Sequence, residues 1–304
     1  MESVRTSRRS VMNTANDWRA LYPFKSNEIA IGSQRLHYLD EGEGEPLLLL
    51  HGNPTWSFYW RNLVLGLRDR YRLIVPDHIG CGLSARPTTS EYPFRLQRRI
   101  EDIVELTERL DLKRITLAAH DWGGCIGMGA AAARPDRFAR FILMNTGAFR
   151  GGRCPLRIRI CRTPFIGRLG VQGFNLFARA ALSMATARPQ GLPAAVRQGL
   201  LAPYDSWQRR TAINEFVRDI PLSSNHPSYQ ALSGVETGLA QFRNHPVCLI
   251  WGMQDWCFTP WFLERFCQSF PQAEVHRFDD AGHYVMEDAY ERIVPIVRRF
   301  LLSS

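Results

Sequence analysis

Lysine is almost absent from this sequence. Of its 38 basic residues only Lys25 and Lys113 are lysines, and the formal net charge is +9. A positive charge can serve binding to nucleic acid or to anionic lipid. The sequence contains no nucleic-acid-binding motif and no lysine-rich tract. An arginine-biased composition therefore accounts for the charge better than a nucleic-acid partner does.

Paired cysteines, long apolar runs and internal repeats are also missing. The seven cysteines form no C-x-x-C pair and have no zinc-type spacing, which argues against a disulfide framework and a metal site. No apolar run reaches the length of a transmembrane helix. No apolar segment follows Arg8 and Arg9, as a secretion signal would require. We therefore expect free thiols in a reducing cytoplasm.

The sequence begins with a basic and polar segment. Residues 1–23 are expected to form a disordered tail, and Met12 is an alternative start of the natural chain.

Beyond this tail, short strands alternate with helices. Residues 28–31 and 35–38 are typical of a hairpin. Buried strands are predicted at residues 46–50, 71–75, 115–119, 138–145, 247–251 and 274–278. Helices are predicted at residues 57–69, 95–110, 123–134, 260–269 and 286–301. This alternation predicts a parallel α/β sheet with both faces covered, whose functional residues collect at the carboxyl ends of the strands.

The stretch over residues 115–124 reads I-T-L-A-A-H-D-W-G-G. An apolar strand runs directly into a small-x-nucleophile-x-glycine pattern, with Asp121 at the nucleophile position. Such a strand-to-helix turn forces its central residue toward positive φ and needs small neighbours, here Ala119 and Gly123. The turn places the Asp121 side chain beside a helix N-terminus, whose free N–H groups can stabilise negative charge. A helix N-cap is the alternative role for Asp121.

The alternation of strands and helices stops at residue 146. Residues 146–244 contain apolar helical stretches interrupted by prolines and no buried-strand pattern. A segment of about a hundred residues is too long for an ordinary loop. We therefore expect a core formed by residues 24–145 and 245–304, with an inserted helical cap at residues 146–244.

Three motifs resemble the α/β-hydrolase fold, and within it the haloalkane dehalogenase group. They are H-G-N-P-T-W at residues 51–56, H-D-W-G-G at residues 120–124 and G-H-Y at residues 282–284. The resemblance implies a mostly parallel central sheet flanked by helices, with an inserted helical cap. It also implies a catalytic triad in the order nucleophile, acid and base, formed by Asp121, Asp255 and His283.

The position of the acid rests on this resemblance. The family places the acid either after the strand that carries Asn145 or after the strand that precedes Asp255. Asparagine cannot carry the charge of an acid, so the role falls to Asp255, with Asp279 and Asp280 as alternatives. For His283 the alternative is a loop histidine without a catalytic role.

The resemblance also assigns two anion-binding residues. It gives the side chains of Asn53 and Trp122 the task of holding the leaving anion, since both offer neutral N–H donors. Their backbone N–H groups would form the oxyanion hole. A carboxylate nucleophile suits displacement at saturated carbon and would form an alkyl ester of Asp121. In a hydrolase, His283 would then activate water against that ester.

The cap carries a second resemblance. Its segments P-Y-D-S-W (residues 203–207), R-D-I-P-L (218–222) and H-P-S-Y (226–229) resemble the caps of dehalogenase-like β-lactone decarboxylases of bacterial long-chain olefin biosynthesis. This implies conversion of cis-3-alkyl-4-alkyloxetan-2-ones to cis-alkenes and carbon dioxide, without a metal or organic cofactor. Attack of Asp121 on the ring C–O carbon or on the lactone carbonyl stays open.

Other functions remain as alternatives. The first is a haloalkane dehalogenase that hydrolyses haloalkanes to alcohol and halide. An epoxide hydrolase is less favoured, because it needs two cap tyrosines and the cap contains only Tyr204 and Tyr229. A hydrolase-fold scaffold that only binds a ligand would be favoured by a damaged triad, and the triad residues are all present.

Five arginines of the cap alternate with apolar residues. They are Arg153, Arg157, Arg159, Arg162 and Arg168. A solvated lid face is the simpler interpretation, and a docking surface for an acidic partner or anionic lipid is the other. The expected partners are a hydrophobic small-molecule substrate and other enzymes of the olefin pathway in an assembly, with peripheral membrane contact.

Overall fold

The computed structural model describes residues 17–303, so residues 1–16 of the predicted tail lie outside the described residues. The following residues differ from the expectation of a disordered tail. The 3-10 helix η2 (Trp18–Leu21) is ordered, and the Trp18 ring lies edge-on against Trp56 at 5.7 Å between centroids. The hydroxyls of Tyr22 and Ser57 share a hydrogen bond of 2.5 Å. Burial of these aromatic rings against the core holds the segment in place.

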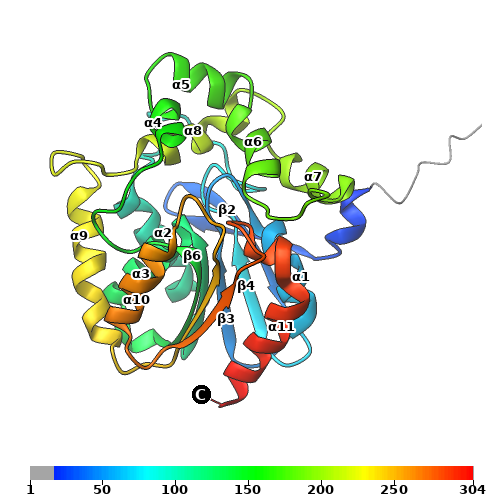
Figure 1. The fold of residues 1–304 in the computed structure, drawn as a ribbon, viewed down its shortest axis with the longest axis vertical. Coiled ribbons are helices and arrows are strands. Elements are labelled where there is room, and N and C mark those ends of the chain that lie inside the picture. Colours follow the sequence, from blue (N-terminus) through cyan, green and yellow to red (C-terminus); the bar gives the residue numbers. More distant parts are fainter. Residues whose placement is uncertain (1–16, 304) are drawn as a thin grey trace, which may run out of the picture.

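One eight-stranded sheet forms the centre of the described residues (Figure 1). Its strands are β1 (Ser26–Ile31), β2 (Gln34–Glu41), β3 (Pro46–Leu50), β4 (Arg72–Pro76), β5 (Ile115–Asp121), β6 (Phe138–Thr146), β7 (Val247–Gly252) and β8 (Glu274–Phe278). Their order across the sheet is β1-β2-β4-β3-β5-β6-β7-β8. The pairs β1–β2 and β2–β4 are antiparallel and the others are parallel. The predicted hairpin and mostly parallel sheet are confirmed.

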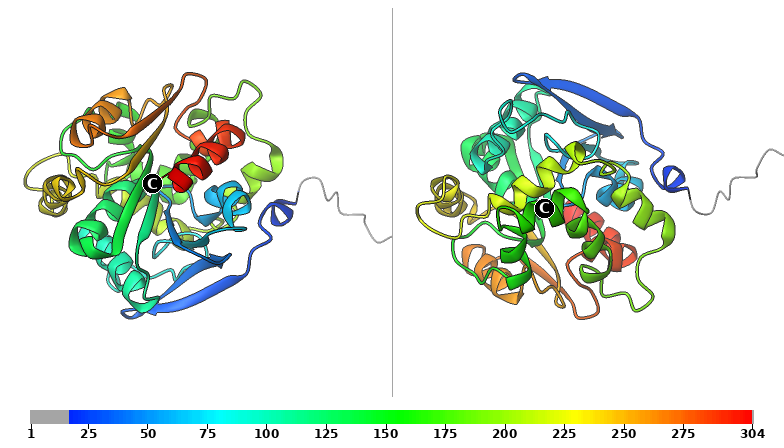
Figure 2. Two further views of the ribbon diagram at one scale, coloured as in Figure 1. Left: turned by 90° about the horizontal axis from the view of Figure 1, so that it is seen from below. Right: turned by 90° about the horizontal axis from the view of Figure 1, so that it is seen from above.

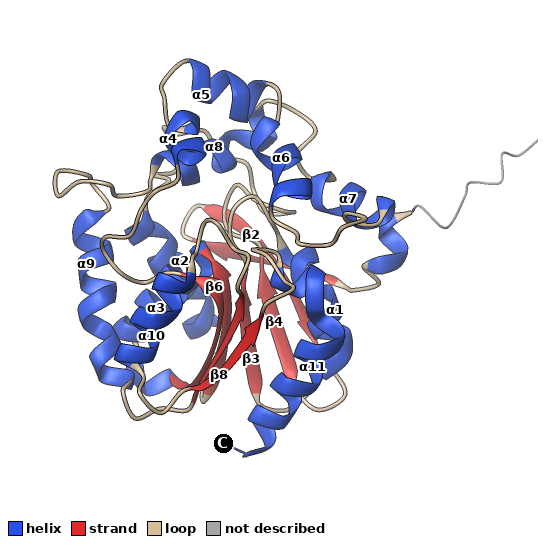
Figure 3. Ribbon diagram, in the orientation of Figure 1, coloured by secondary structure: helices blue, strands red, loops and turns tan. Residues whose placement is uncertain are grey.

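Helices cover both faces of this sheet and its upper edge (Figure 3). They are α1 (Arg61–Leu67), α2 (Leu96–Arg109), α3 (Trp122–Ala133), α4 (Leu156–Cys161), α5 (Ile166–Arg168), α6 (Leu176–Met184), α7 (Ala194–Leu201), α8 (Thr211–Arg218), α9 (Tyr229–Gly238), α10 (Pro260–Ser269) and α11 (Val285–Ser303). Short 3-10 helices are η3 (Ser57–Trp60), η4 (Pro135–Arg137), η6 (Gln208–Arg210) and η7 (Leu239–Phe242), and η5 (Leu169–Gly173) is a π-helix. None of the described helices is both long and apolar enough to cross a membrane.

The side chains of each buried strand pack alternately against the two helix layers. In β3, Leu47 and Leu49 join the core beneath α1 and α11, whereas Leu48 and Leu50 join the core beneath α2, α3 and α10. All four leucines have no exposed surface. Successive side chains of a strand point to opposite faces, so a strand covered on both sides must be apolar throughout. The view from below in Figure 2 separates these two helix layers.

The cap lies over the carboxyl ends of the parallel strands (Figures 1 and 3). It begins where β6 ends, at Thr146, and contains α4 to α8. Helix α9 does not belong to it, because α9 packs along α3 and α2 beside the sheet. The cap is therefore shorter than the predicted 146–244 and ends before Tyr229. An apolar helical pattern is the same in a cap and in a flanking layer, so the sequence did not separate the two.

Helix α3 approaches the sheet very closely at its first turn. A Cβ atom added to Gly123 would overlap the backbone carbonyl oxygen of Leu50, and one added to Gly124 would overlap the side chain of Thr146. Glycine is therefore required at both positions by close packing of backbone on backbone and side chain.

Replacement of Gly123 by alanine should lower the free energy of unfolding by about 3 kcal/mol, the upper range for overpacking, because the backbone of β3 cannot move away. Gly234→Ala in α9 is the matched control, since a Cβ there has open space. It should raise the free energy of unfolding by about 0.5 kcal/mol. Urea denaturation measures both variants, and equal effects would contradict this account of the turn.

Candidate active site

Asp121 occupies a strained turn between β5 and α3. Its φ is 53° and its ψ is −126°, a region that residues with a side chain rarely adopt. Asp121 precedes α3 by position, but its carboxylate makes no capping hydrogen bond to that helix. The carboxylate is thus not a typical N-cap, whose partner is the second or third N–H group of the helix. Instead, Oδ1 accepts the backbone N–H of Asn53 at 2.6 Å.

The neighbouring loop leaves room for this contact. A Cβ atom added to Gly52 would overlap the carboxylate of Asp121. The H-G-N segment after β3 therefore needs glycine next to Asn53, so that its backbone can reach the nucleophile position. The backbone N–H of Asn53, which the resemblance assigns to the oxyanion hole, thus donates to one carboxylate oxygen of Asp121.

His283 lies between two carboxylates. Its Nδ1–H donates to Oδ2 of Asp255 at 2.8 Å, and its Nε2 is 3.7 Å from Oδ2 of Asp121. All three side chains are buried. The three residues predicted as a triad are thus brought together from the ends of β5 and β7 and from the loop after β8. The alternative acids lie elsewhere: Asp279 and Asp280 are exposed.

Both carboxylate oxygens of Asp255 accept two hydrogen bonds each. Its Oδ1 accepts the backbone N–H groups of Cys257 at 2.7 Å and Phe258 at 3.0 Å. Its Oδ2 accepts the side-chain N–H of Asn145 at 3.0 Å as well as His283. These hydrogen bonds fix the orientation of the carboxylate and stabilise its charge in a buried place.

Asn145 is a residue that the sequence reasoning treated only as an uncharged position. Its amide bridges the two parts of the site, since it also exchanges hydrogen bonds of 2.8 and 3.0 Å with the backbone of Gly252. The sequence does indicate a special position, because Asn145 lies at the end of a buried strand. Asparagine tolerates the positive φ of 35° that is observed there. Asn145 positions Asp255 and does not face the substrate cavities described below.

Aromatic rings fix the plane of the His283 imidazole. Phe258 stacks on it at 5.7 Å with an interplanar angle of 16°. On another side the ring of His120 lies 4.6 Å away, and His120 Nε2–H donates to the carbonyl oxygen of His283 at 2.8 Å. The histidine of the H-D-W motif therefore supports the loop that carries the proposed base.

Burial and neighbouring charges act on the pKa values of both Asp121 and His283. Burial raises the pKa of Asp121, and the charge of His283 with the backbone N–H groups of Asn53 and Trp122 opposes that rise. For His283, burial lowers the pKa, but the charge and hydrogen bond of Asp255 and the charge of Asp121 outweigh it. The pKa of His283 is therefore raised above its ordinary value, which favours an imidazolium beside the carboxylates.

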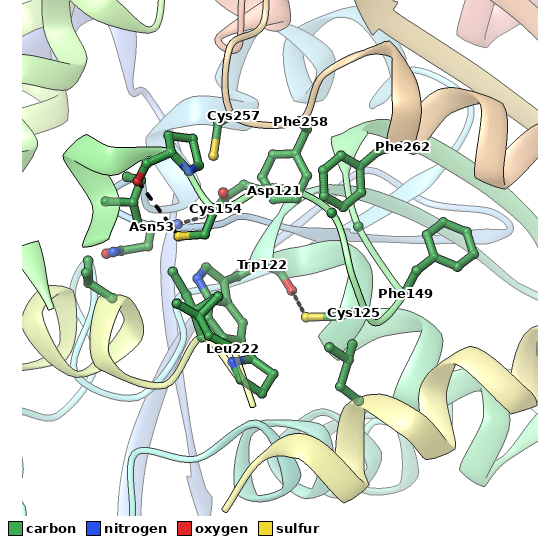
Figure 4. Close-up of a pocket in the computed structure, with 18 of the residues that line it drawn as sticks. Asn53, Asp121, Trp122, Cys125, Phe149, Cys154, Leu222, Cys257, Phe258 and Phe262 are labelled. Atoms are coloured by element: carbon green, nitrogen blue, oxygen red, sulfur yellow. Dashed lines mark hydrogen bonds between the residues drawn. The ribbon is translucent and has the colours of Figure 1, made fainter. Parts of the chain in front are cut away.

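Two cavities meet at Asp121. The first has a volume of about 160 Å³, and its walls include Trp122, Phe149, Cys154, Leu222, Phe258 and Phe262 (Figure 4). The second has a volume of about 270 Å³, and its walls include Pro54, Ala180, Met184, Trp256, His283 and Tyr284. The junction is lined by the residues common to both, which are Asn53, Asp121, Ile158, Phe177 and Cys257. Mostly apolar walls suit alkyl groups.

The predicted anion-binding pair borders this junction. The side-chain amide of Asn53 donates one N–H to the carbonyl oxygen of Ile213 at 3.2 Å, and its own oxygen is buried without a partner. The indole of Trp122 lines the first cavity (Figure 4). The guanidinium of Arg99 lies 5.8 Å from the Trp122 ring centre and 3.7 Å from that of Phe216. The buried, positively charged guanidinium of Arg99 thus lies next to the Trp122 ring.

The cap motifs of the sequence anchor the cap to the core. Asp219 is buried and accepts hydrogen bonds from Arg99 at 3.2 Å, Arg95 at 3.1 Å and the Ser228 hydroxyl at 2.6 Å. Arg95 immediately precedes α2, Arg99 lies in its first turn, and Ser228 immediately precedes α9. The motif residues at 218–222 and 226–229 therefore fix the cap over the strand ends, and Leu222 adds a wall of the first cavity.

The α/β hydrolase fold family matches residues 45–290, and the chain belongs to this family. Within it, the chain is 42% identical to the cis-3-alkyl-4-alkyloxetan-2-one decarboxylase of Shewanella oneidensis, over 93% of this chain and 90% of that protein. It is 32% identical to haloalkane dehalogenase 2 of Mycobacterium bovis, over 92% of this chain and 96% of that protein. The crystal structure of the haloalkane dehalogenase DbeA from Bradyrhizobium elkani has the same fold, with a TM-score of 0.82 at 24% identity, and the alignment covers 92% of this chain and 100% of that chain. The family resemblance predicted from the sequence is confirmed.

Replacement of Asp255 by asparagine should lower the pKa of His283. The charge that stabilises the imidazolium is lost, whereas the burial that favours the neutral ring remains. NMR titration of the imidazole resonances measures this change. Asp279→Asn removes an equal charge from the loop near His283 and should leave its pKa unchanged. Equal shifts in both variants would show that Asp255 is not the specific partner.

Proposed function

We propose that this protein is a β-lactone decarboxylase that converts cis-3-alkyl-4-alkyloxetan-2-ones into cis-alkenes and carbon dioxide. The observation that carries the proposal is the position of Asp121 at the junction of two apolar cavities. The substrate in the name of the Shewanella relative bears alkyl groups on two adjacent ring atoms. A nucleophile placed between two apolar arms suits that substrate better than a single-chain haloalkane.

In the first step Asp121 attacks C4, the saturated ring carbon that is bonded to the ring oxygen. Its Oδ2 is the attacking atom, because Oδ1 is held by the backbone N–H of Asn53. The bond from Oδ2 to C4 forms and the bond from C4 to the ring oxygen breaks, with inversion at C4. The ring opens to a carboxylate on C3. The charge of Asp121 passes to this carboxylate, so the number of negative charges in the site is unchanged.

In the second step the bond between C3 and the carboxylate carbon breaks and carbon dioxide leaves. Its electron pair becomes the double bond between C3 and C4 and expels Asp121 as a carboxylate. Anti elimination after inversion at C4 converts a cis ring into a cis alkene. No water is consumed, and the free enzyme is restored with its own oxygen atoms.

The negative charges that arise in both steps can be stabilised by neutral N–H donors and by one imidazolium cation. The side chains of Asn53 and Trp122 line the first cavity beside Asp121, and we assign them to hold the released carboxylate until carbon dioxide leaves. The His283 imidazolium, held by Asp255, stabilises the negative charge as it moves between Asp121 and the substrate. In this reaction His283 does not need to activate water.

The haloalkane dehalogenase remains the second candidate, because the same triad can hydrolyse an alkyl ester of Asp121. An epoxide hydrolase has no support from Tyr204 and Tyr229, the two tyrosines that the sequence predicted to lie in the cap. Neither Tyr204 nor Tyr229 lines the two cavities, and the hydroxyl of Tyr204 donates to the backbone carbonyl of Thr55 at 3.1 Å.

All seven cysteines are free thiols. Free thiols throughout the chain support the further proposal that the protein works in the reducing cytoplasm.

Turnover in heavy-oxygen water distinguishes the two candidate reactions. Decarboxylation breaks the alkyl C–O bond of the Asp121 ester, so Asp121 should keep its own oxygens and the product should be an alkene. Hydrolysis by attack on the ester carbonyl would place solvent oxygen in Asp121. Mass spectrometry of the peptide that contains Asp121, with gas chromatography of the product, measures both outcomes.

The His283→Gln variant provides the control for this experiment. A hydrolase without its base accumulates the alkyl ester on Asp121, whereas the decarboxylase should turn over slowly without a trapped ester. Labelled Asp121 together with a hydroxylated product would contradict the decarboxylase and leave the dehalogenase.

Narrowing one cavity should affect only one alkyl chain of the lactone. Cys154→Phe fills the first cavity and Ala180→Phe fills the second, and both residues are half-buried at the walls. Each variant should lower kcat/KM by about a hundredfold for the lactone with a long chain in that cavity, from the lost burial of several methylenes.

Two regioisomeric lactones measure this selectivity, one with octyl at C3 and methyl at C4 and the other with these groups exchanged. The two variants should slow opposite isomers. Slowing of the same isomer by both variants would contradict the assignment of one chain to each cavity, whereas absence of lactone turnover in the unaltered protein would contradict the function itself.

A further inference from the structure

The outer surface of the cap is unusually apolar. Seven large apolar side chains are exposed on α4, α5, η5 and the start of α6, namely Leu156, Ile160, Phe165, Ile166, Leu169, Phe174 and Leu176. Phe165 is 88% exposed and Ile166 is 76% exposed. The elements α4, α5, η5 and α6 contact one another in this order, so the side chains belong to one surface, which we call the cap face. Large exposed apolar patches mark interaction sites in soluble proteins.

The chain around the cap face carries charged side chains of positive sign only. Residues 147–204 contain nine arginines and neither aspartate nor glutamate. Arg159 is exposed three residues after Leu156 in α4, and Arg179 is exposed three residues after Leu176 in α6. Helix residues three apart share a face, so these two arginines border the exposed leucines.

The structure also separates the five cap arginines singled out from the sequence. Arg162 differs from the others because it is half-buried and donates to the backbone carbonyl of Ile220. Arg168 is exposed but donates to the side chain of Gln172 at 3.2 Å. Arg153, Arg157 and Arg159 are exposed. Arg153 and Arg157 also line the first and the second cavity, so Arg159, together with Arg179, is the arginine of the outer surface that is available to an anionic surface.

The cap face is continuous with both cavities. Leu176 is 56% exposed and also lines the second cavity, and Leu222 is 47% exposed and lines the first. Figure 1 places α4, α5 and α6 at the outer end of the molecule, above the strand ends that carry Asp121. An apolar molecule that enters either cavity from this side therefore meets an exposed leucine at the cavity wall.

We propose that the cap face docks on an anionic lipid bilayer. The apolar side chains enter the interface and the arginines contact the lipid phosphates, the arrangement that binds amphipathic surfaces to anionic membranes. Exposed apolar groups without arginines would suit a second copy of the chain, but the exposed arginines Arg153, Arg159 and Arg179 would repel their counterparts across such an interface. This proposal does not depend on which reaction Asp121 performs.

Vesicle flotation tests the docking. The probes are vesicles of pure phosphatidylcholine and vesicles with one third phosphatidylglycerol. The unaltered protein should float with the anionic vesicles and lose this binding as salt increases. The double variant Phe165→Ser/Ile166→Ser should bind about a hundredfold more weakly, because two large apolar side chains no longer enter the interface. Arg159→Gln/Arg179→Gln should weaken binding by roughly 25-fold, about fivefold for each arginine.

Matched controls lie at the opposite end of the molecule. Arg70 and Arg243 are exposed and precede β4 and β7 at the amino ends of the parallel strands. Arg70→Gln/Arg243→Gln removes the same charge as the cap pair and should retain full vesicle binding. Leu302→Ser removes an apolar side chain that is 63% exposed near the end of α11 and should also retain it. Thermal unfolding of every variant checks that the fold is intact.

Three results would overturn the proposal. The first is absence of flotation with the anionic vesicles at low salt. The second is loss of binding in the control variants to the same extent as in the cap variants. The third is self-association, or capture of an acidic protein, that the cap variants abolish while vesicle binding is absent, since the face would then bind protein rather than lipid.

Discussion

The contact between the Asp121 carboxylate and the backbone N–H of Asn53 is the constraint on which the site depends. It requires a residue with positive φ at the end of β5, because only that turn points the side chain toward the loop after β3. It requires glycine at position 52, where any side chain would overlap the carboxylate. It also requires α3 to begin against the sheet, where Gly123 meets the backbone of β3. The apolar strands place these backbones within one rigid layer.

The electrostatics of the site follow from this geometry. A buried carboxylate is costly unless donors and a cation surround it. Asp255 has three hydrogen bonds besides that of His283, whereas Asp121 is held at one oxygen and faces His283 with the other. Two acids of the same type thus have different environments. Asp255, which accepts more hydrogen bonds, orients the His283 imidazole, and Asp121, which accepts fewer, is the residue that we propose as the nucleophile.

The cap combines two tasks that need different surfaces. Its inner side completes both cavities and is fixed to the core by buried Asp219, which accepts hydrogen bonds from Arg95, Arg99 and Ser228. Its outer side carries apolar residues that no other part of the described chain covers. The cavities are continuous with this outer side through Leu176 and Leu222, each of which is both exposed and part of a cavity wall. The proposed substrate and the proposed membrane contact are therefore compatible, because a long-chain lactone dissolves in lipid and the cap lies over the cavities that reach Asp121.

Local patterns in the sequence determined the order of the strands and helices and the turn at Asp121, and the resemblance of its motifs predicted the three residues, Asp121, Asp255 and His283, that the structure brings together. These features depend on the period of apolar residues and on motifs of a few residues, both of which can be read along the chain. The tertiary structure alone decided four further points: the docking of Trp18, the place of α9 beside the sheet, the bridge that Asn145 makes to Asp255, and the branching of the cavity at Asp121. Each depends on segments that lie far apart in the sequence, such as β6 with the loop after β7, or α6 with the loop after β3. The shape and the hydrogen bonds between such segments arise only when the whole core packs, and no local pattern records them.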